Sequence, residues 1–223
     1  MRKLISILIT ISIILTAFCS CATTPKMTTE LATTPNGYLI EPGEACTVEG
    51  YYTYEVVEYD GEHTNLIPEA EKLVRSWWND DETFKNPEIV WVDIYEDFRG
   101  FQDSGYIFLD TDATSEDILA TIVHEWIHFL VDPSTLINYE DGWGRTVMEM
   151  VVESITVDIM EAAGYTVEPT PNYLYFKDNT KIWIHKVELE KAFRNQEDYT
   201  AYERIFGEDY IEIVETATAI LRV

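Results

Sequence analysis

The sequence predicts an α+β fold, in which a small mixed or antiparallel sheet packs on one helix and a mostly helical C-terminal part follows. Two observations predict it. Short runs rich in aromatic and β-branched residues occupy the first half of the chain, whereas helical periodicity dominates from residue 114 onward. Strands followed by helices, without regular alternation, are typical of the α+β class.

Composition indicates a folded protein with one domain. The 223 residues are 46% hydrophobic and 13% aromatic, and the formal net charge is −26. This composition supports a packed core. The negative charge and the absence of a Lys/Arg cluster exclude nucleic acid as a partner.

The N-terminus reads as an export signal. Arg2 and Lys3 precede an apolar run over Leu4–Phe18, which is short for a membrane-spanning helix. Residues 1–20 are therefore predicted to be a signal peptide. Residues 21–37, rich in Thr and Pro, are predicted to be a tether, and residues 38–223 the folded domain.

The end of this signal resembles the lipobox of bacterial lipoproteins. Cys21, which follows Ser20, fits that pattern better than Cys19, which follows the bulky Phe18. The resemblance implies that the exported chain is held on the extracytoplasmic face of the cell membrane by acyl chains on Cys21. Only Cys46 then remains in the folded domain, as a small filler that has no cysteine to pair with.

Each element is predicted from its periodicity and its end signals. Thr114 and Asp117 form a possible capping box for the longest early helix, and Gly164 suits the end of the next one. Strands are expected at Tyr51–Tyr59, Glu88–Tyr95 and Gly105–Asp110. Helices are expected at Pro68–Asn79, Thr114–Val131 and Trp143–Gly164, and among Ile182–Asn195, Tyr199–Ile205 and Tyr210–Leu221.

The helix over Thr114–Val131 contains the sequence His124-Glu125-Trp126-Ile127-His128, an H-E-x-x-H motif. Histidines four residues apart lie on one helix face, where both imidazoles can bind a single ion. Zinc suits such a site because it accepts imidazole readily and lowers the pKa of its bound water toward neutrality. We expect one Zn²⁺ per chain.

A catalytic zinc needs a third protein ligand. Val131 and Ser134 exclude the longer form of the motif, in which a glycine and a third histidine occupy these positions. The remaining common solution is a glutamate from the next helix, which contains Glu149 and Glu153. Since they are four residues apart and share a face, periodicity does not separate them.

With these residues the sequence resembles the gluzincin metallopeptidases, which combine H-E-x-x-H with a downstream glutamate. In that group the glutamate commonly begins a run like Glu153-Ser154-Ile155-Thr156, so the resemblance favours Glu153 over Glu149. It also implies a zincin-like fold, and it makes Glu125 the general base that activates metal-bound water. Many relatives have an aspartate four residues beyond the ligand, where this chain has Val157.

Other roles follow from the same resemblance. The strand over Gly105–Asp110 would be the sheet edge on which a peptide is laid, unless it is an ordinary sheet strand. His185, Tyr173 or Tyr175 would donate a hydrogen bond to the oxyanion, with His185 preferred. Trp143 is expected in the core rather than in a substrate cleft. His63, which has no motif around it, is expected at the surface.

These inferences predict a lipid-anchored zinc metallopeptidase that hydrolyses peptides or proteins at the cell envelope. The alternative is a non-catalytic envelope lipoprotein that acts as a binding module, with a structural metal or none. Loss of hydrolysis in Glu125→Gln with the metal retained distinguishes the enzyme from the alternative.

Overall fold

The computed structural model describes residues 32–43, 45–48, 52–78, 80–95, 99–131, 143–167, 169–170, 173–174, 177–178 and 181–220. The expectations for the signal peptide, Cys19, Cys21 and Tyr175 lie outside these residues. One compact unit spans Thr33–Val223. It therefore includes residues 33–37, which were expected to belong to the tether. Within the described residues, no helix is long and apolar enough to span a bilayer.

The described elements are those of an α+β protein, and every predicted strand and helix has a counterpart among them. The strands are β1 (Cys46–Val48), β2 (Tyr52–Val56), β3 (Glu88–Ile94), β4 (Gly100–Asp103) and β5 (Tyr106–Asp110). The α-helices are α2 (Ile67–Trp78), α3 (Ser115–Leu130), α4 (Trp143–Ala162), α6 (Lys186–Arg194), α7 (Ala201–Phe206) and α8 (Tyr210–Ile220). Short 3₁₀ helices are η1 (Glu62–Leu66), η2 (Lys181–His185) and η3 (Gly207–Asp209).

The five strands form one mixed sheet in the order β1-β2-β3-β5-β4. Strands β3 and β5 are parallel, and the other neighbours are antiparallel. The sheet edge next to β5 is therefore β4, so the expectation that Gly105–Asp110 is an edge strand is wrong. Four consecutive residues of β5, from Ile107 to Asp110, are buried, as expected for an inner strand with both faces covered.

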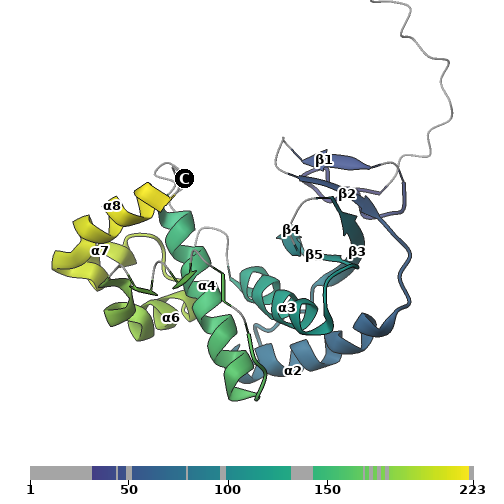
Figure 1. Ribbon diagram of the computed structural model, residues 1–223. Coiled ribbons are helices and arrows are strands. Elements are labelled where there is room, and N and C mark those ends of the chain that lie inside the picture. Colours follow the sequence, from purple (N-terminus) through teal and green to yellow (C-terminus); the bar gives the residue numbers. More distant parts are fainter. Residues whose placement is uncertain are drawn as a thin grey trace, which may run out of the picture. The chain divides into compact units, whose positions relative to one another are not determined.

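The sheet is covered on both faces. Trp91, Ile107 and Leu109 belong to the main core, which they share with the helices. On the other face a smaller core contains Tyr54, Phe101 and Phe108, against which residues 38–40 pack. Figure 1 shows β3, β5 and β4 beside α3, with β1 and β2 farther from that helix. The sheet therefore supports α3 through one of its faces.

Helix α3 begins where the sequence predicts it. The Thr114 side chain accepts a hydrogen bond from the Asp117 backbone N–H, which stabilises the first turn. One side of the helix buries a continuous apolar surface: Ile118, Leu119, Ile122, Val123, Trp126, Ile127 and Leu130. Because α3 contacts β4 and β5 as well as α2 and α4, its position is fixed from several directions.

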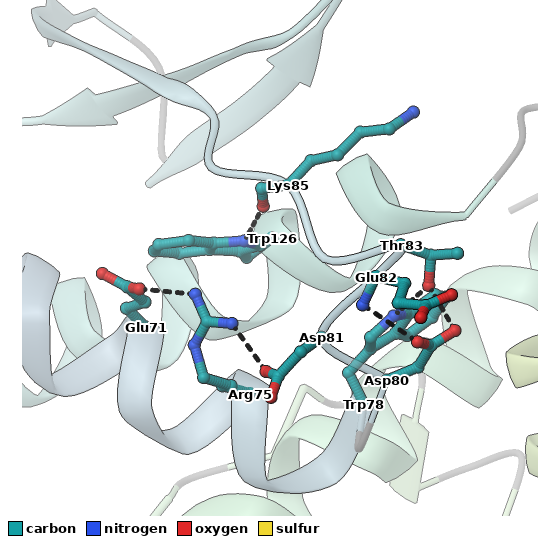
Figure 2. Close-up of polar contacts among 9 residues, drawn as sticks. All are labelled: Glu71, Arg75, Trp78, Asp80, Asp81, Glu82, Thr83, Lys85 and Trp126. Carbon is teal, nitrogen blue, oxygen red and sulfur yellow. Dashed lines mark hydrogen bonds and ion pairs between the residues drawn. The ribbon is translucent and has the colours of Figure 1, made fainter.

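The segment between α2 and β3 holds α3 on the side of Trp126 (Figure 2). The Trp126 indole N–H donates to the Lys85 carbonyl at 3.0 Å. The Arg75 guanidinium stacks over the Phe84 ring, 3.9 Å from its centroid. Arg75 also binds Glu71 and Asp81 at 2.8 and 2.9 Å. These contacts connect α2 to the middle of the H-E-x-x-H helix, so that the motif is carried by a braced element.

Helix α4 ends as predicted, at a glycine in the left-handed region. Gly164 has φ +89°, and the Tyr165 N–H donates to the Met160 carbonyl at 3.0 Å. At the start of α4, Trp143 is buried against Tyr202 and Tyr210, with ring centroids 5.0 and 5.6 Å away. The expectation that Trp143 is a core residue is confirmed. It joins α4 to the C-terminal helices α7 and α8.

Candidate metal centre

The two histidines of the motif lie together on the side of α3 that faces α4. Their Nε2 atoms are 3.1 Å apart, and their ring centroids are 4.8 Å apart in an edge-to-face arrangement. The apolar residues Ile122, Val123 and Ile127 are buried beside them. The predicted pairing of His124 and His128 on one face is therefore present.

Helix α4 supplies a carboxylate to this pair, and it comes from Glu149. Its Oε2 lies 3.2 Å from Nε2 of His128 and 3.5 Å from Nε2 of His124. Within the described residues, His124, His128 and Glu149 are the group whose donor atoms converge closely enough to hold a metal ion. The structure thus brings together the glutamate that the sequence reasoning ranked second.

Glu153 lies one turn further along α4 and binds a different atom. Its Oε2 is 3.3 Å from Nδ1 of His124, on the side of the ring away from Glu149. Its Oε1 accepts the Thr170 backbone N–H at 3.1 Å. The sequence favours Glu153 as the third ligand. In the structure the Glu153 carboxylate contacts Nδ1 of His124, and it is the Glu149 carboxylate that joins the convergent group.

Glu153 lies four residues beyond Glu149 on α4 and contacts the ring of His124. A carboxylate that accepts from the distal nitrogen of a metal-binding histidine fixes the orientation of the ring and increases its basicity. Glu153 has the contact that such a partner needs.

The separations within the group suit a zinc ion. Ligand atoms ~2.0–2.1 Å from a tetrahedral zinc lie ~3.3 Å from one another. The three distances here, from 3.1 to 3.5 Å, match that value. Two imidazoles and one carboxylate also form the ligand set of catalytic zinc sites that leave the fourth position to water or substrate. The residues present therefore fit one Zn²⁺.

The charges around His124 favour a cation. Burial lowers the pKa of His124, but hydrogen bonds to Glu149 and Glu153 and the charge of Glu125 outweigh this and raise it to about 10. Burial also raises the pKa of Glu149, yet the charge of His128 and hydrogen bonds to both histidines bring it well below its usual value. The Glu149 carboxylate is thus stabilised as an anion by positive charge on the neighbouring histidines.

Glu125 is not part of the ligand group, and it lines a pocket of about 500 Å³ together with His124 and Glu153. Burial raises the pKa of Glu125, while the charges of His124 and His128 oppose that rise. A raised pKa brings a carboxylate closer to the range in which it exchanges protons near neutrality. Glu125 thus lies in the pocket wall next to His124, and its role as a general base stays a prediction.

The other walls of the pocket come from three segments. Helix α3 contributes Glu116, Asp117, Ala120 and Thr121. The edge strand β4 contributes Gly100, and Arg99 directly precedes it. Helix α4 contributes Thr156, and the segment after it contributes Thr166, Val167 and Thr170. The sequence did not point to Arg99 and Gly100, because β4 has only four residues and no strand was predicted there. The sequence signal that could have indicated a strand here is the apolar pair Phe98 and Phe101 on either side of Arg99 and Gly100.

The predicted oxyanion donors do not line this pocket. His185 Nε2 lies 3.4 Å from Asp209 Oδ2, and its ring contacts Phe206 with centroids 5.6 Å apart. Tyr173 is buried with its ring centroid 5.1 Å from that of Trp183, and burial raises its pKa to about 12. Both are thus engaged in packing near the C-terminal helices, and Tyr175 lies outside the described residues.

His63 differs from expectation. It is buried, stacked on Tyr59 with centroids 5.7 Å apart, and its Nδ1 lies 3.4 Å from Ser115 Oγ at the start of α3. The prediction of a surface residue is wrong because η1 folds back onto α3, a tertiary contact that local sequence does not report.

Comparisons with models of known protein families, with curated proteins and with solved structures find no match to this chain. Inference about its function therefore depends on the chemistry of the residues above.

Proposed function

We propose that this protein is a zinc-dependent hydrolase. The observation that carries the proposal is the convergence of His124, His128 and Glu149 at distances that fit one zinc ion, with Glu125 beside them in a pocket. More particularly, we propose a gluzincin-type metallopeptidase with a zincin-like fold. The third ligand is Glu149, and Glu153 orients His124.

The residues of the chain divide the work of peptide hydrolysis among them. A zinc ion held by the three ligands supplies Lewis acidity and lowers the pKa of a bound water. Glu125 accepts a proton from the attacking water and returns it to the leaving amine. Burial raises the pKa of Glu125, which favours the protonated form that donates to the amine.

The peptide substrate is proposed to pair with the outer edge of β4. The Asp110 N–H donates to the Arg99 carbonyl at 3.0 Å, which makes these two residues a hydrogen-bonded pair of the β4–β5 ladder. By the alternation of an antiparallel ladder, Gly100 and Gln102 direct their backbone groups toward the outer edge. An extended peptide added there lies beside the pocket that contains Glu125.

The first test is Glu125→Gln in the zinc-loaded full chain. The amide has nearly the same shape but does not accept a proton, so hydrolysis of a peptide library should fall by at least ~10²-fold. Zinc content, measured by elemental analysis, should stay at about one per chain. Equal hydrolysis by the two proteins would show that the activity does not come from this site. No hydrolysis by either one would favour the non-catalytic alternative.

A further inference from the structure

One cation stands in the wall of the pocket. Among the residues that the structure describes around it, Arg99 is the only lysine or arginine, and it lies next to Gly100 at the beginning of the edge strand. Its side chain is 46% exposed. A guanidinium remains charged at all relevant pH values and offers donors in a planar fork that matches a carboxylate.

Arg99 is held in place by a buried carboxylate. Asp110 Oδ2 lies 3.4 Å from Arg99 Nη1, and the two residues also share a backbone hydrogen bond. Asp110 is itself 3% exposed, and its Oδ1 accepts from the backbone N–H groups of Ile94 and Asp112 at 3.3 and 3.5 Å. The guanidinium is thus directed by a group that the sheet fixes, which lowers the cost of ordering it when an anion binds.

The direction of β4 indicates which part of a peptide would meet Arg99. Antiparallel strand pairs outnumber parallel ones, so we take the bound peptide to run opposite to β4. Strand β4 runs from Gly100 to Asp103, and the carboxyl end of such a peptide then lies toward Arg99. The part of such a peptide nearest the guanidinium is therefore its carboxyl-terminal part.

We infer that Arg99 recognises a carboxylate in the carboxyl-terminal part of the bound peptide, and that Asp110 positions Arg99. This inference rests on the proposed peptidase function. The carboxylate has two possible sources, the C-terminus of the peptide or the side chain of an aspartate or glutamate. Arg99 is in either case a specificity residue, since it contacts substrate away from the bond that breaks.

The acidic walls set a limit on this preference. Glu116 and Asp117 also line the pocket, and the whole chain has a charge of −26. Long-range repulsion of an anion is screened beyond ~8 Å at physiological salt, whereas a direct contact with the guanidinium is not. One carboxylate at the Arg99 position is accepted, and negative charges elsewhere on the peptide weaken binding.

The experiment measures peptide binding to the zinc-loaded full chain that carries Glu125→Gln, so that no turnover intervenes. Three acetylated tetrapeptides with the same apolar side chains serve as probes: one with a free carboxylate, one with a C-terminal amide, and one amide with a final glutamate. We expect the free acid, the glutamate peptide or both to bind roughly tenfold more tightly than the apolar amide. Which of them does so identifies the source of the carboxylate.

Three further substitutions isolate Arg99. Arg99→Gln should abolish the preference, and Arg99→Lys should retain part of it, because the charge remains but the fork is lost. Arg204→Gln is the matched control: Arg204 also pairs with a carboxylate, that of Glu197 on the surface, and does not line the pocket. That control should keep the full preference. Thermal unfolding verifies that each variant is folded. If Arg99→Gln does not fold, the reduced preference expected of Arg99→Lys tests the role of Arg99 instead.

The outcomes separate this inference from the proposed function. Equal binding of all three probes, or a preference that survives Arg99→Gln, would overturn the role of Arg99, even if the chain containing Glu125 hydrolyses peptides. An Arg99-dependent preference in a protein without any hydrolytic activity would instead support the carboxylate site and refute the peptidase.

Discussion

At the scale of single residues, the two glutamates of α4 contact different atoms of the two motif histidines. Glu149 contacts Nε2 of both histidines, and Glu153 contacts the opposite nitrogen of His124. Sequence periodicity placed both on one face, but only the packing of α4 against α3 decides which of them reaches the convergent group. A rule drawn from the local run after the glutamate therefore ranked them in the other order.

This division predicts different losses of metal. Glu149→Ala removes a ligand, so stoichiometric zinc should be lost. Glu153→Ala removes an orienting partner, and zinc affinity should fall by ~10–100-fold while a bound ion is still detected at saturation. Competition with a chelator measures both. Glu161→Ala, at an exposed position of the same helix, should change neither. Retention of zinc in Glu149→Ala together with its loss in Glu153→Ala would restore the original ranking.

The pKa of His124 predicts a proton release. At about 10 in the metal-free protein, that pKa keeps the imidazole protonated at neutral pH, and zinc has to displace the proton. Titration calorimetry at pH 7.5 in two buffers of different ionisation enthalpy should therefore show about one proton released per zinc. His185→Gln, remote from the pocket, should give the same value. Heats that are independent of the buffer would contradict the prediction.

The same shift has a consequence for the metal-free fold. A folded pKa raised above the usual 6.5 contributes stability that is fully present below pH 6.5 and is lost as the pH rises through about 10. Glu149, whose pKa is lowered, contributes stability that is lost as the pH falls below its usual 4.5. These two groups thus favour the fold between those limits, with the alkaline loss due to His124.

At the scale of elements, the close approach of β4 to α3 depends on Gly100. A Cβ at this position would lie 2.6 Å from the Phe108 carbonyl oxygen and 2.8 Å from Thr121 Cγ2. Since the first of these atoms belongs to the backbone of β5, the strand itself would have to move. The edge strand and the H-E-x-x-H helix are therefore packed at a distance that only glycine permits.

We expect Gly100→Ala to lower the free energy of unfolding by about 1–3 kcal/mol, the usual cost of overpacking. Hydrolysis should fall as well, because the peptide-binding edge shifts relative to Glu125. Gly207→Ala is the control: its φ is +52° and no atom lies within 4 Å of the added Cβ, so it strains the backbone without moving β4. Chemical denaturation and kinetics on one peptide measure both effects. Unchanged stability in Gly100→Ala would contradict the packing argument.

The elements show where sequence reasoning succeeds. Helix α3 has a capping threonine, a continuous apolar face and a clear end, so its start and end differ from the prediction by one residue. Strands β1 and β4 have three and four residues and were missed, since so short a run has no readable alternation. The inner position of β5 could have been predicted from its unbroken apolar run Tyr106–Leu109.

At the scale of the whole molecule, the compact unit Thr33–Val223 includes five residues that were assigned to the tether, because the predicted domain spans residues 38–223. The difference arises from side-chain contacts that composition does not reveal. Asn36 donates to Asp103 and Ser104 at the β4–β5 turn, and Thr33 pairs with Leu39. Composition rich in Thr and Pro predicts a flexible tether over residues 21–37, whereas its last five residues belong to the folded unit.

We propose that the mature chain is anchored through acyl chains on Cys21. Stable retention requires more than one chain, because a single one holds a protein only marginally. Cys21→Ser should release the protein from membranes or leave its signal uncleaved, and fractionation with mass spectrometry of the N-terminus measures this. Cys46→Ser, in the folded unit, should leave retention unchanged. An unmodified mature N-terminus at another residue would refute the anchor.

The attachment of residues 33–39 to the sheet then limits how far the folded unit can lie from a lipid anchor at Cys21. If Cys21 is in the lipid and the folded unit begins at Thr33, only residues 22–32 bridge the gap, and these eleven residues extend to at most about 40 Å. Had the tether run to Gly37, the reach would have been longer. The hydrogen bonds of Asn36 to the β4–β5 turn thus shorten the free tether and limit the distance between an anchor at Cys21 and Thr33 to that length.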